Sequence, residues 1–225
     1  MNIYTFGSIG YSEAKRLFSE NEGLCRARFA EFFINQFTAI ETIHQTSGAV
    51  LDYMIKHAEP VEGVPLEEGQ FVFRAALPGT DQICICPLSE GGIYRGLWEL
   101  GAALNCGLQA DVLKIPVDQE VVEIMELLNS DPYEADSEGC FLIALPESLH
   151  IESAEELLKM LHMETVTTSV TKQENSALND LNFACIGHTI KGKTRTLKMP
   201  EGIRYLTPPG RQSRDMAAKK ADRGN

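Results

Sequence analysis

Residues 81–116 read DQICICPLSEGGIYRGLWELGAALNCGLQADVLKIP, and this stretch decides the fold that the sequence predicts. An apolar run over 82–88 indicates a buried strand, and a second run over 111–117 indicates another. Between them lie a turn with two glycines and a segment whose apolar side chains have helical spacing. Parallel α/β sheets bind ligands at the carboxyl ends of their strands, where such a turn lies. We therefore expect the functional site beside this turn.

Other segments continue the alternation of strand and helix. Residues 2–10 predict a first strand that ends in a Gly-Ser turn, and residues 140–145 predict another continuous apolar strand. Strands that are apolar throughout are typical of a parallel sheet covered by helices on both faces. The sequence therefore predicts an α/β fold, namely a Rossmann-like three-layer domain whose sheet is mostly parallel.

One pair of apolar runs leaves the direction of a strand open. Residues 71–77 and 82–88 are separated by Pro-Gly-Thr-Asp, which suits either a hairpin turn or a short link between elements that do not pair. A hairpin here would add an antiparallel strand to an otherwise parallel sheet.

The composition changes after residue 164, and we divide the chain there. Residues 1–164 form the predicted Rossmann-like domain, and residues 165–207 are predicted to be a β-rich extension. Ten of the 20 lysine and arginine residues lie after residue 190. The last segment, 208–225, combines this basic charge with few large apolar side chains, so we expect a disordered basic tail.

A helix is predicted over 24–45, followed by a shorter one over 48–57. The aromatic stripe formed by Phe29, Phe32, Phe33 and Phe37 falls on one broad face of the longer helix. We interpret this stripe as core packing, and the alternative is a groove that binds a partner. Residues 129–139, in contrast, form an acidic loop before the strand at 140–145.

The charge of the chain limits the partners that it can bind. The formal net charge is −12 and the sequence pI is about 4.9. Such a surface repels DNA, RNA and anionic membranes, so we expect nucleic acid to bind only at the basic tail, if at all. No segment has the roughly 18 apolar residues of a membrane span. Residues 1–20 lack the basic and apolar regions of a secretory signal, which predicts a cytoplasmic protein.

The six cysteines and five histidines have no metal-site spacing. Most of the cysteines lie inside apolar runs such as ICIC and FACIG, as buried free thiols do. We expect neither a metal nor another cofactor, because the chemistry considered below requires none.

The turn at 91–92 and the helix after it carry the candidate site. Gly91, Gly92 and Gly96 permit a tight turn and a close approach of ligand to backbone, and the N–H groups of a helix start favour phosphate. Arg95 can pair with a phosphate, and Glu99 can act as nucleophile or general acid/base at an anomeric carbon. The alternative is a surface ion pair between Arg95 and Glu99, worth about 0.3 kcal/mol.

These residues resemble those of known nucleotide-binding families. A strand, a glycine-bearing turn and a helix that starts with Glu99-Leu-Gly101 look like the nucleoside 2-deoxyribosyltransferase and nucleotide N-glycosidase superfamily. The stretch is also similar to the Lonely-guy/SLOG group of Rossmann-like domains. The opening Tyr4-Thr-Phe-Gly-Ser8 looks like the first strand and turn of those families. The resemblance implies that Glu99 is the catalytic residue and that Gly91, Gly92 and Gly96 are the glycines of the phosphate turn. We also expect Arg95 and the turn at Gly7 and Ser8 to bind phosphate or sugar oxygens of the nucleotide.

The predicted function is that of an enzyme that binds a nucleotide or nucleoside and cleaves or transfers at its N-glycosidic bond. One alternative is a non-catalytic module of the same fold that senses a nucleotide. Another is an acidic interaction protein in which the fold is only a scaffold. The resembling families commonly complete their sites across a dimer, which adds a homo-oligomer to the prediction.

Overall fold

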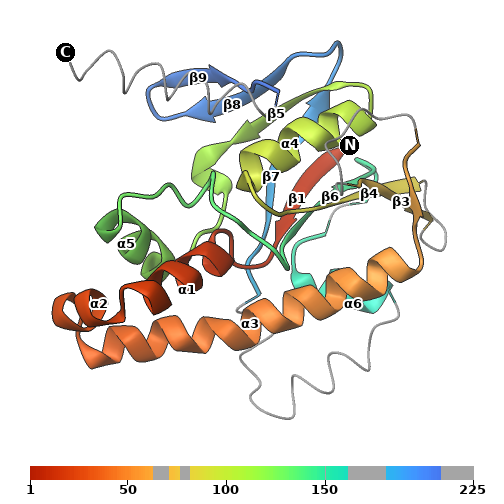
Figure 1. Ribbon diagram of the computed structural model, residues 1–225. Coiled ribbons are helices and arrows are strands. Elements are labelled where there is room, and N and C mark those ends of the chain that lie inside the picture. Colours follow the sequence, from red (N-terminus) through yellow and green to blue (C-terminus); the bar gives the residue numbers. More distant parts are fainter. Residues whose placement is uncertain (63–70, 77–81, 150, 162–180, 209–225) are drawn as a thin grey trace.

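The protein is described by a computed structural model, which covers residues 1–62, 71–76, 82–149, 151–161 and 181–208. Within these ranges, nine strands form one sheet in the order β2-β3-β4-β6-β1-β7-β5-β8-β9 (Figure 1). The strands are β1 (Asn2–Phe6), β2 (Glu59–Pro60), β3 (Phe73–Ala76), β4 (Gln82–Pro87), β5 (Gly107–Asp111), β6 (Phe141–Leu145), β7 (Phe183–Ile190), β8 (Arg195–Met199) and β9 (Gly202–Tyr205). The helices are α1 (Tyr11–Glu20), α2 (Glu22–Arg28), α3 (Glu31–Lys56), α4 (Gly92–Ala103), α5 (Gln119–Leu127) and α6 (Ala154–Met160), with a 3₁₀ turn η1 (Val112–Lys114).

The prediction of a mixed α/β fold is confirmed, but the prediction of a mostly parallel, Rossmann-like sheet is wrong. The central strand β1 pairs antiparallel with both β6 and β7, and β6 pairs antiparallel with β4. Among the described pairs of neighbouring strands, only β5 and β8 are parallel. The apolar runs correctly predicted burial, but a strand that is buried on both faces can run in either direction.

Residues 82–116 form a strand, a helix and a second strand, as predicted, with one shift along the chain. The turn before α4 contains Gly91 and Gly92, whose φ angles are 87° and 56°. Strand β5 ends at Asp111, where we predicted its start, and the chain then turns as η1. Strands β3 and β4 pair antiparallel, which decides between the two alternatives for residues 71–88 in favour of a hairpin-like pairing.

Helix α3 joins two segments that we predicted as separate helices. It continues through Thr46 and Ser47 without a break. The Ser47 hydroxyl donates to the backbone oxygens of His44 at 2.8 Å and Gly139 at 3.0 Å. A serine whose hydroxyl is bonded in this way is accommodated within a helix and need not end it.

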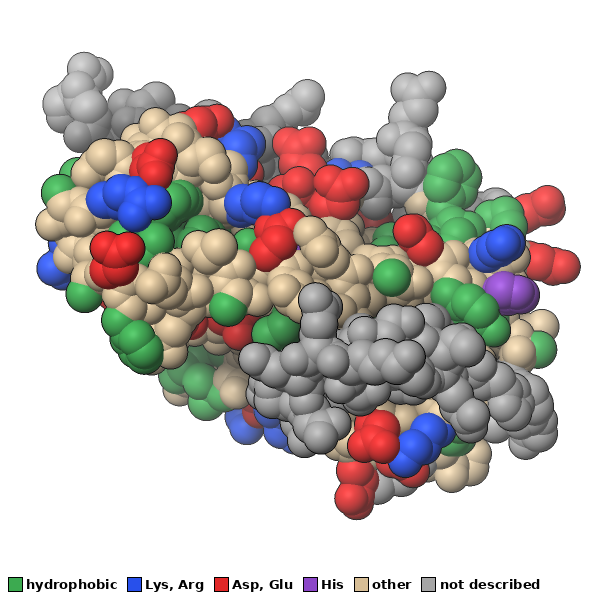
Figure 2. Space-filling model, turned by 90° about the horizontal axis from the view of Figure 1, so that it is seen from below, with side chains coloured by type: hydrophobic (Ala, Val, Ile, Leu, Met, Phe, Trp, Pro, Cys, Tyr) green, Lys and Arg blue, Asp and Glu red, His purple; other side chains and the backbone are tan. Residues whose placement is uncertain are grey.

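The aromatic stripe of α3 is only in part a core. Phe37 and Ile40 belong to a buried cluster with Tyr11 of α1 and Ile124 of α5. Phe32 is 73% exposed, so the buried face is narrower than the sequence suggested. On the face that α3 crosses, acidic and basic side chains are interspersed (Figure 2).

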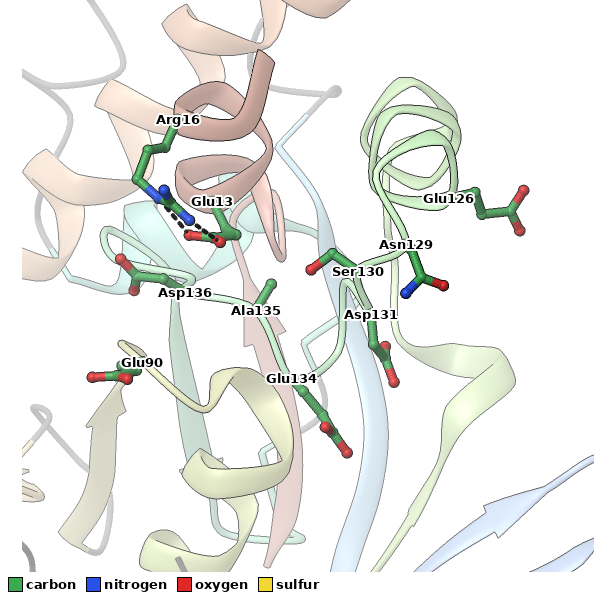
Figure 3. Close-up of a pocket in the computed structure, with 10 residues that line it drawn as sticks. All are labelled: Glu13, Arg16, Glu90, Glu126, Asn129, Ser130, Asp131, Glu134, Ala135 and Asp136. Atoms are coloured by element: carbon green, nitrogen blue, oxygen red, sulfur yellow. Dashed lines mark hydrogen bonds and ion pairs between the residues drawn. The ribbon is translucent and has the colours of Figure 1, made fainter. Parts of the chain in front are cut away.

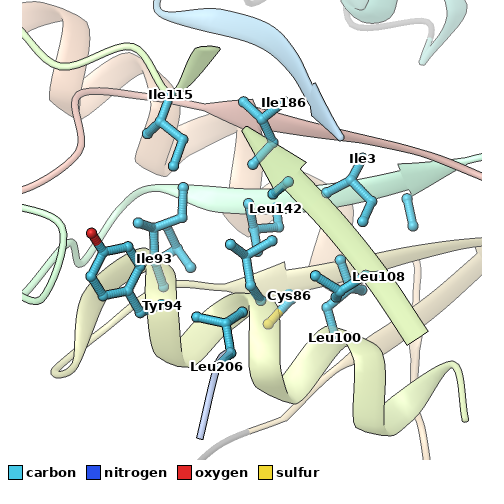
Figure 4. Close-up of a cluster of buried hydrophobic side chains, with 14 of the residues drawn as sticks. Ile3, Cys86, Ile93, Tyr94, Leu100, Leu108, Ile115, Leu142, Ile186 and Leu206 are labelled. Atoms are coloured by element: carbon cyan, nitrogen blue, oxygen red, sulfur yellow. The ribbon is translucent and has the colours of Figure 1, made fainter. Parts of the chain in front are cut away.

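Helices cover both faces of the sheet. Helix α4 packs on one face, where Leu100 belongs to the same cluster as Ile3 and Leu142 (Figure 4). Helices α3 and α6 cover the other face, where Met54 and Leu157 belong to a second cluster. Each such side chain contributes about 1.5–3 kcal/mol on burial. Packing of this kind fixes α4, and with it the turn at 91–92, on the sheet.

Strands β7 to β9 are part of the main sheet. Strand β7 lies between β1 and β5, and β8 and β9 follow at one edge. The division of the chain into domains at residues 164 and 207 stays a prediction. The predicted strand near 165–171 and residues 209–225 of the predicted basic tail lie outside the described residues. Among the described helices, none combines the length and apolar character that crossing a membrane requires.

Candidate functional site

A hollow of about 940 Å³ lies where α1, α4 and α5 meet the loop 129–139 (Figure 3). Its lining consists of Glu13, Arg16, Glu90, Glu126, Asn129, Ser130, Asp131, Glu134, Ala135 and Asp136. Glu13 and Arg16 come from α1, Glu90 from the turn before α4, and the others from α5 and the loop after it. Six of these ten residues are carboxylates, and we call the hollow the acidic cleft.

The loop 129–139 forms the cleft by capping two helices with its backbone. The N–H of Ile93, in the first turn of α4, donates to the Tyr133 oxygen at 3.0 Å. The N–H of Glu13, in the first turn of α1, donates to the Asp136 oxygen at 3.3 Å. The first N–H groups of a helix have no acceptor within the helix, and here the loop supplies one to each. These two amides are therefore not available to a phosphate.

Glycines allow the loop to lie against both helix starts. Gly92 has a φ of 56°, and a Cβ there would lie 2.5 Å from the Tyr133 oxygen and 2.6 Å from the Ala135 oxygen. Gly10, before α1, has a φ of 77°, and a Cβ there would lie 3.0 Å from the Pro132 oxygen. Only glycine combines this backbone conformation with so close an approach.

Two of the cleft carboxylates have cationic partners. Glu13 pairs with Arg16 at 2.5 Å (Figure 3). The same guanidinium reaches Glu20 at 2.6 Å. Glu134 pairs with Arg204 of β9 at 3.0 Å. The one arginine that lines the cleft is thus already shared between two carboxylates.

Asp131 is a cleft carboxylate whose surroundings disfavour its charged form. Burial raises its pKa, and the nearby charge of Glu134 raises it further. A hydrogen bond of 2.9 Å from the Tyr133 N–H and the charge of Arg204 act in the opposite direction but do not compensate. A cation in the cleft would favour the charged form of Asp131.

Glu99 does not face this cleft. It is 3% exposed, and its Oε1 accepts a hydrogen bond from Arg95 Nε at 2.7 Å. A second hollow, of about 1070 Å³, lies beside β2 and β3, and Glu99 lines neither hollow. Burial raises the pKa of the neighbouring Cys86 thiol well above its usual range, and the charge of Glu99 adds to this effect. Arg95 and Glu99 therefore form an ion pair inside the protein. The two alternatives predicted from the sequence were a catalytic Glu99 and an ion pair on the surface.

The turn after β1 is also enclosed. Ser8 is fully buried, and its backbone oxygen accepts hydrogen bonds from the Tyr11 N–H at 3.2 Å and from the Cys140 thiol at 3.3 Å. Gly7 has a φ of 100°, and a Cβ there would lie 2.9 Å from both Cys140 Sγ and Ser47 Oγ. This turn therefore holds α3 and the start of β6 close to β1.

The predicted site residues consequently lie in different surroundings. Gly91 and Gly92 lie beside Glu90 at the edge of the acidic cleft. Gly96 is buried, and a Cβ there would overlap Leu88. The assignment of nucleotide contacts to these glycines, to Gly7 and Ser8 and to Arg95 stays a prediction.

The sequence pointed to the turn at 91–92 but missed the carboxylates that lie opposite it. They come from α1, α5 and the loop 129–139, which are far apart in the sequence. The density of acidic residues in 129–139 was the available signal. It could not be used, because nothing in the sequence shows that this loop caps α1 and α4.

The cleft is not a ready-made metal site. The part of the chain that the structure describes contains no group of three or more His, Cys, Asp or Glu side chains that could hold a metal ion. Mg²⁺ is usually bound by one or two protein carboxylates and takes its other ligands from water and substrate phosphates. The carboxylates of the cleft therefore fit a Mg²⁺ ion that enters already bound to the phosphates of a ligand.

Comparison with solved structures identifies the fold. The hydrogenase maturation protein HypE of E. coli matches with a TM-score of 0.54 and 20% identity, over 93% of this chain and 50% of that chain. A second structure of E. coli HypE gives a TM-score of 0.50 at 19% identity, over 93% and 50% of the two chains. A HypE structure in complex with ATP gives 0.48 at 16% identity, over 92% and 50%. The chain thus spans about half the length of the structures that it matches.

Two other comparisons give no relative. A scan against protein-family models finds no match, and a search of the curated proteins finds none either.

The structural match corrects the resemblance drawn from the sequence. The chain has the fold of part of HypE and not that of the deoxyribosyltransferase or Lonely-guy/SLOG families. The motif around Glu99 misled because a strand, a glycine turn and a helix also occur in a mostly antiparallel sheet. The predicted N-glycosidase activity is likewise wrong, in agreement with the burial of Glu99 on α4.

Proposed function

We propose that this chain binds a nucleotide as its magnesium complex in the acidic cleft, as part of a nucleotide-using protein of the HypE kind. The observation that carries the proposal is a hollow of about 940 Å³ with six carboxylates in its lining. Small-molecule sites in proteins have volumes of about 300–1,000 Å³, so a nucleotide fits.

The charge of the cleft selects the form of the ligand. Six carboxylates repel the phosphates of a free nucleotide. A magnesium complex of the same nucleotide presents a cation that one or two of these carboxylates can bind. We assign Asp131 to the ion, because burial disfavours its charged form and a bound cation would favour it. Nothing in this assignment requires a chemical step, and the carboxylates are assigned to binding alone.

The choice of a nucleotide follows from HypE. HypE is a hydrogenase maturation protein, and one HypE structure contains ATP. The present chain shares the fold of HypE over about half its length, so other groups of a complete HypE-like site would come from outside the matched region.

Thermal unfolding tests the proposal. The protein is heated with ATP and MgCl₂, with ATP and EDTA, and with MgCl₂ alone, at one ionic strength. A ligand at 100 times its dissociation constant stabilises the folded state by about 2.7 kcal/mol, so we expect a rise in Tm with ATP and MgCl₂ together. A rise of the same size with ATP and EDTA, or no rise with ATP and MgCl₂, would contradict the proposal.

A further inference from the structure

Two arginines on neighbouring strands lie over aromatic rings of α4, one helical turn apart. Arg204 of β9 lies 4.7 Å from the ring centroid of Tyr94, and Arg195 of β8 lies 4.2 Å from that of Trp98. Arg204 has a carboxylate partner, because its Nη2 donates to Glu134 at 3.0 Å. The Nε of Arg195 is buried and has no acceptor among the described residues. The two arrangements are alike except that, among the described residues, only Arg204 has a carboxylate partner.

Helix α4 is shaped to receive Arg195. A Cβ at Gly101 would overlap Arg195 Nε and would lie 2.9 Å from its Cδ, so the absence of a side chain opens a notch for the guanidinium. Trp98, one turn earlier on the helix, has its ring centroid 4.2 Å from Cζ of the same group. Both Trp98 and Arg195 remain part-exposed. Since Nε is buried and the residue as a whole is part-exposed, we assign the contact with a ligand from solution to the two Nη groups.

The charge of Arg195 is held there at a cost. Burial lowers its pKa, and the charge interaction with Cys106 acts in the opposite direction. The carbonyl end of α4 also favours a cation but supplies no hydrogen-bond acceptor to Nε. The segment 191–195 reads KGKTR, so two more cations, Lys191 and Lys193, lie close by in the chain, and both are exposed.

We propose that Arg195 and Trp98 form a binding site for a phosphate group, at the opposite end of α4 from the acidic cleft. The Nη groups of a guanidinium present parallel N–H donors that match two oxygens of an oxyanion. The contact with the Trp98 ring, 4.2 Å from Arg195 Cζ to the ring centroid, holds the guanidinium in place. The charges of Lys191 and Lys193, close to Arg195 in the chain, favour the dianion over a singly charged carboxylate. The site is independent of the nucleotide proposed for the acidic cleft.

Tryptophan fluorescence tests this site directly, because Trp98 is the only tryptophan in the chain. Inorganic phosphate is titrated into the full chain at constant ionic strength, and acetate is titrated in a parallel experiment. We expect a saturable change of Trp98 emission with phosphate and reduced quenching of Trp98 by acrylamide. An equal response to acetate, or no saturable response to phosphate, overturns the proposal.

Three variants assign the response to Arg195. Arg195→Met should weaken phosphate binding at least about tenfold, since it removes charged hydrogen-bond donors. Arg204→Met removes the matched guanidinium over Tyr94 and should leave the Trp98 response in place. Gly101→Ala keeps Arg195 but displaces its Nε, and should also weaken binding. An unchanged response in both Arg195→Met and Gly101→Ala overturns the proposal, and circular dichroism confirms that each variant is folded.

Discussion

Asp131 links the stability of the folded protein to the binding of a cation. Burial raises the pKa of this carboxyl above its usual value of 3.8, so the folded protein binds its proton more tightly than the unfolded chain does. The free energy of unfolding therefore falls as the pH rises from about 3.8 through the raised pKa. An asparagine at this position keeps the acceptor for the Tyr133 N–H and removes the charge.

We predict that Asp131→Asn increases the free energy of unfolding at neutral pH, and that the difference from the wild type disappears below pH 3.8. Urea denaturation across this pH range measures it. Glu155→Gln, which removes a negative charge from the exposed surface of α6, is the control and should show a much smaller difference. A destabilised Asp131→Asn variant at neutral pH would show that the Asp131 charge is already compensated.

For the ion pair of Arg95 and Glu99 we predict the opposite effect, a lower free energy of unfolding when the carboxylate is replaced. Glu99 is 3% exposed and Arg95 is 14% exposed, so Glu99→Gln leaves a guanidinium with less compensation in a mostly buried place. We predict a loss of about 1–3 kcal/mol in the free energy of unfolding. The rise in Tm caused by ATP and MgCl₂ should not change. If Glu99→Gln abolished that rise and left the stability unaltered, Glu99 would have to contact the ligand after all.

Gly92 should be sensitive to a side chain for two reasons, of which Gly192 shares only one. Both glycines have a positive φ, but a Cβ at Gly92 would meet the loop backbone, whereas a Cβ at Gly192 has nothing within 4 Å. We predict that Gly92→Ala costs about 1–3 kcal/mol more than Gly192→Ala, because overpacking adds to the backbone strain. Urea denaturation of the two variants measures the difference. Equal losses would show that the loop 129–139 moves away from the new side chain at no cost in stability.

At the scale of elements, α3 joins two predicted helices into one and thereby connects two buried hydrophobic clusters. Its first half contributes Phe37 to the cluster with α1 and α5, and its second half contributes Met54 to the cluster on the sheet. The hydroxyl of Ser47 bonds across to the Gly139 oxygen, which ties the middle of the helix to the end of the loop 129–139. Stability of the cleft loop and of α3 should therefore be coupled.

Two phenylalanines test which face of α3 is buried. The sequence analysis placed both of them in the same aromatic stripe. Phe37 is 3% exposed and Phe32 is 73% exposed. We predict that Phe37→Ala lowers the free energy of unfolding by about 3–5 kcal/mol, because it leaves a cavity. Phe32→Ala should change it by less than about 0.5 kcal/mol. A large loss for Phe32→Ala would mean that its side chain is covered in solution.

Most strands could be predicted from their apolar runs, whereas their directions could not. The runs at 82–87 and 141–145 are buried on both faces, and this burial gave the prediction of strands covered by helices. Strand β6 pairs antiparallel with both β1 and β4. The direction of a strand depends on the path of the segments that connect it to its neighbours, and an apolar run does not encode that path. Strand β5 was misplaced because the apolar side chains at 112–115 belong to η1 and the residues after it.

For the whole molecule, helix α4 connects the two proposed sites. Its first turn borders the acidic cleft, and its last turns lie against Arg195. The sequence revealed the overall charge of −12 and the basic composition of its end, but not which charged side chains lie against this helix. The site could be predicted only as far as the turn at 91–92, because its carboxylates meet only in the folded chain.

The similarity to HypE covers almost all of this chain but only half of the HypE chain. The fold is shared over 93% of this chain and 50% of the HypE chain. The nucleotide binding that we propose involves only residues of this chain, so it can be measured on the present chain.

Isothermal titration calorimetry of magnesium–ATP into the wild type, Asp131→Asn and Glu155→Gln tests the central claim most directly. The account predicts saturable binding to the wild type and to Glu155→Gln that EDTA abolishes. It predicts binding to Asp131→Asn that is at least about tenfold weaker, since a ligand of the ion is lost. Binding that survives EDTA, or that is equal in the wild type and Asp131→Asn, would contradict the claim that the acidic cleft holds a magnesium-complexed nucleotide.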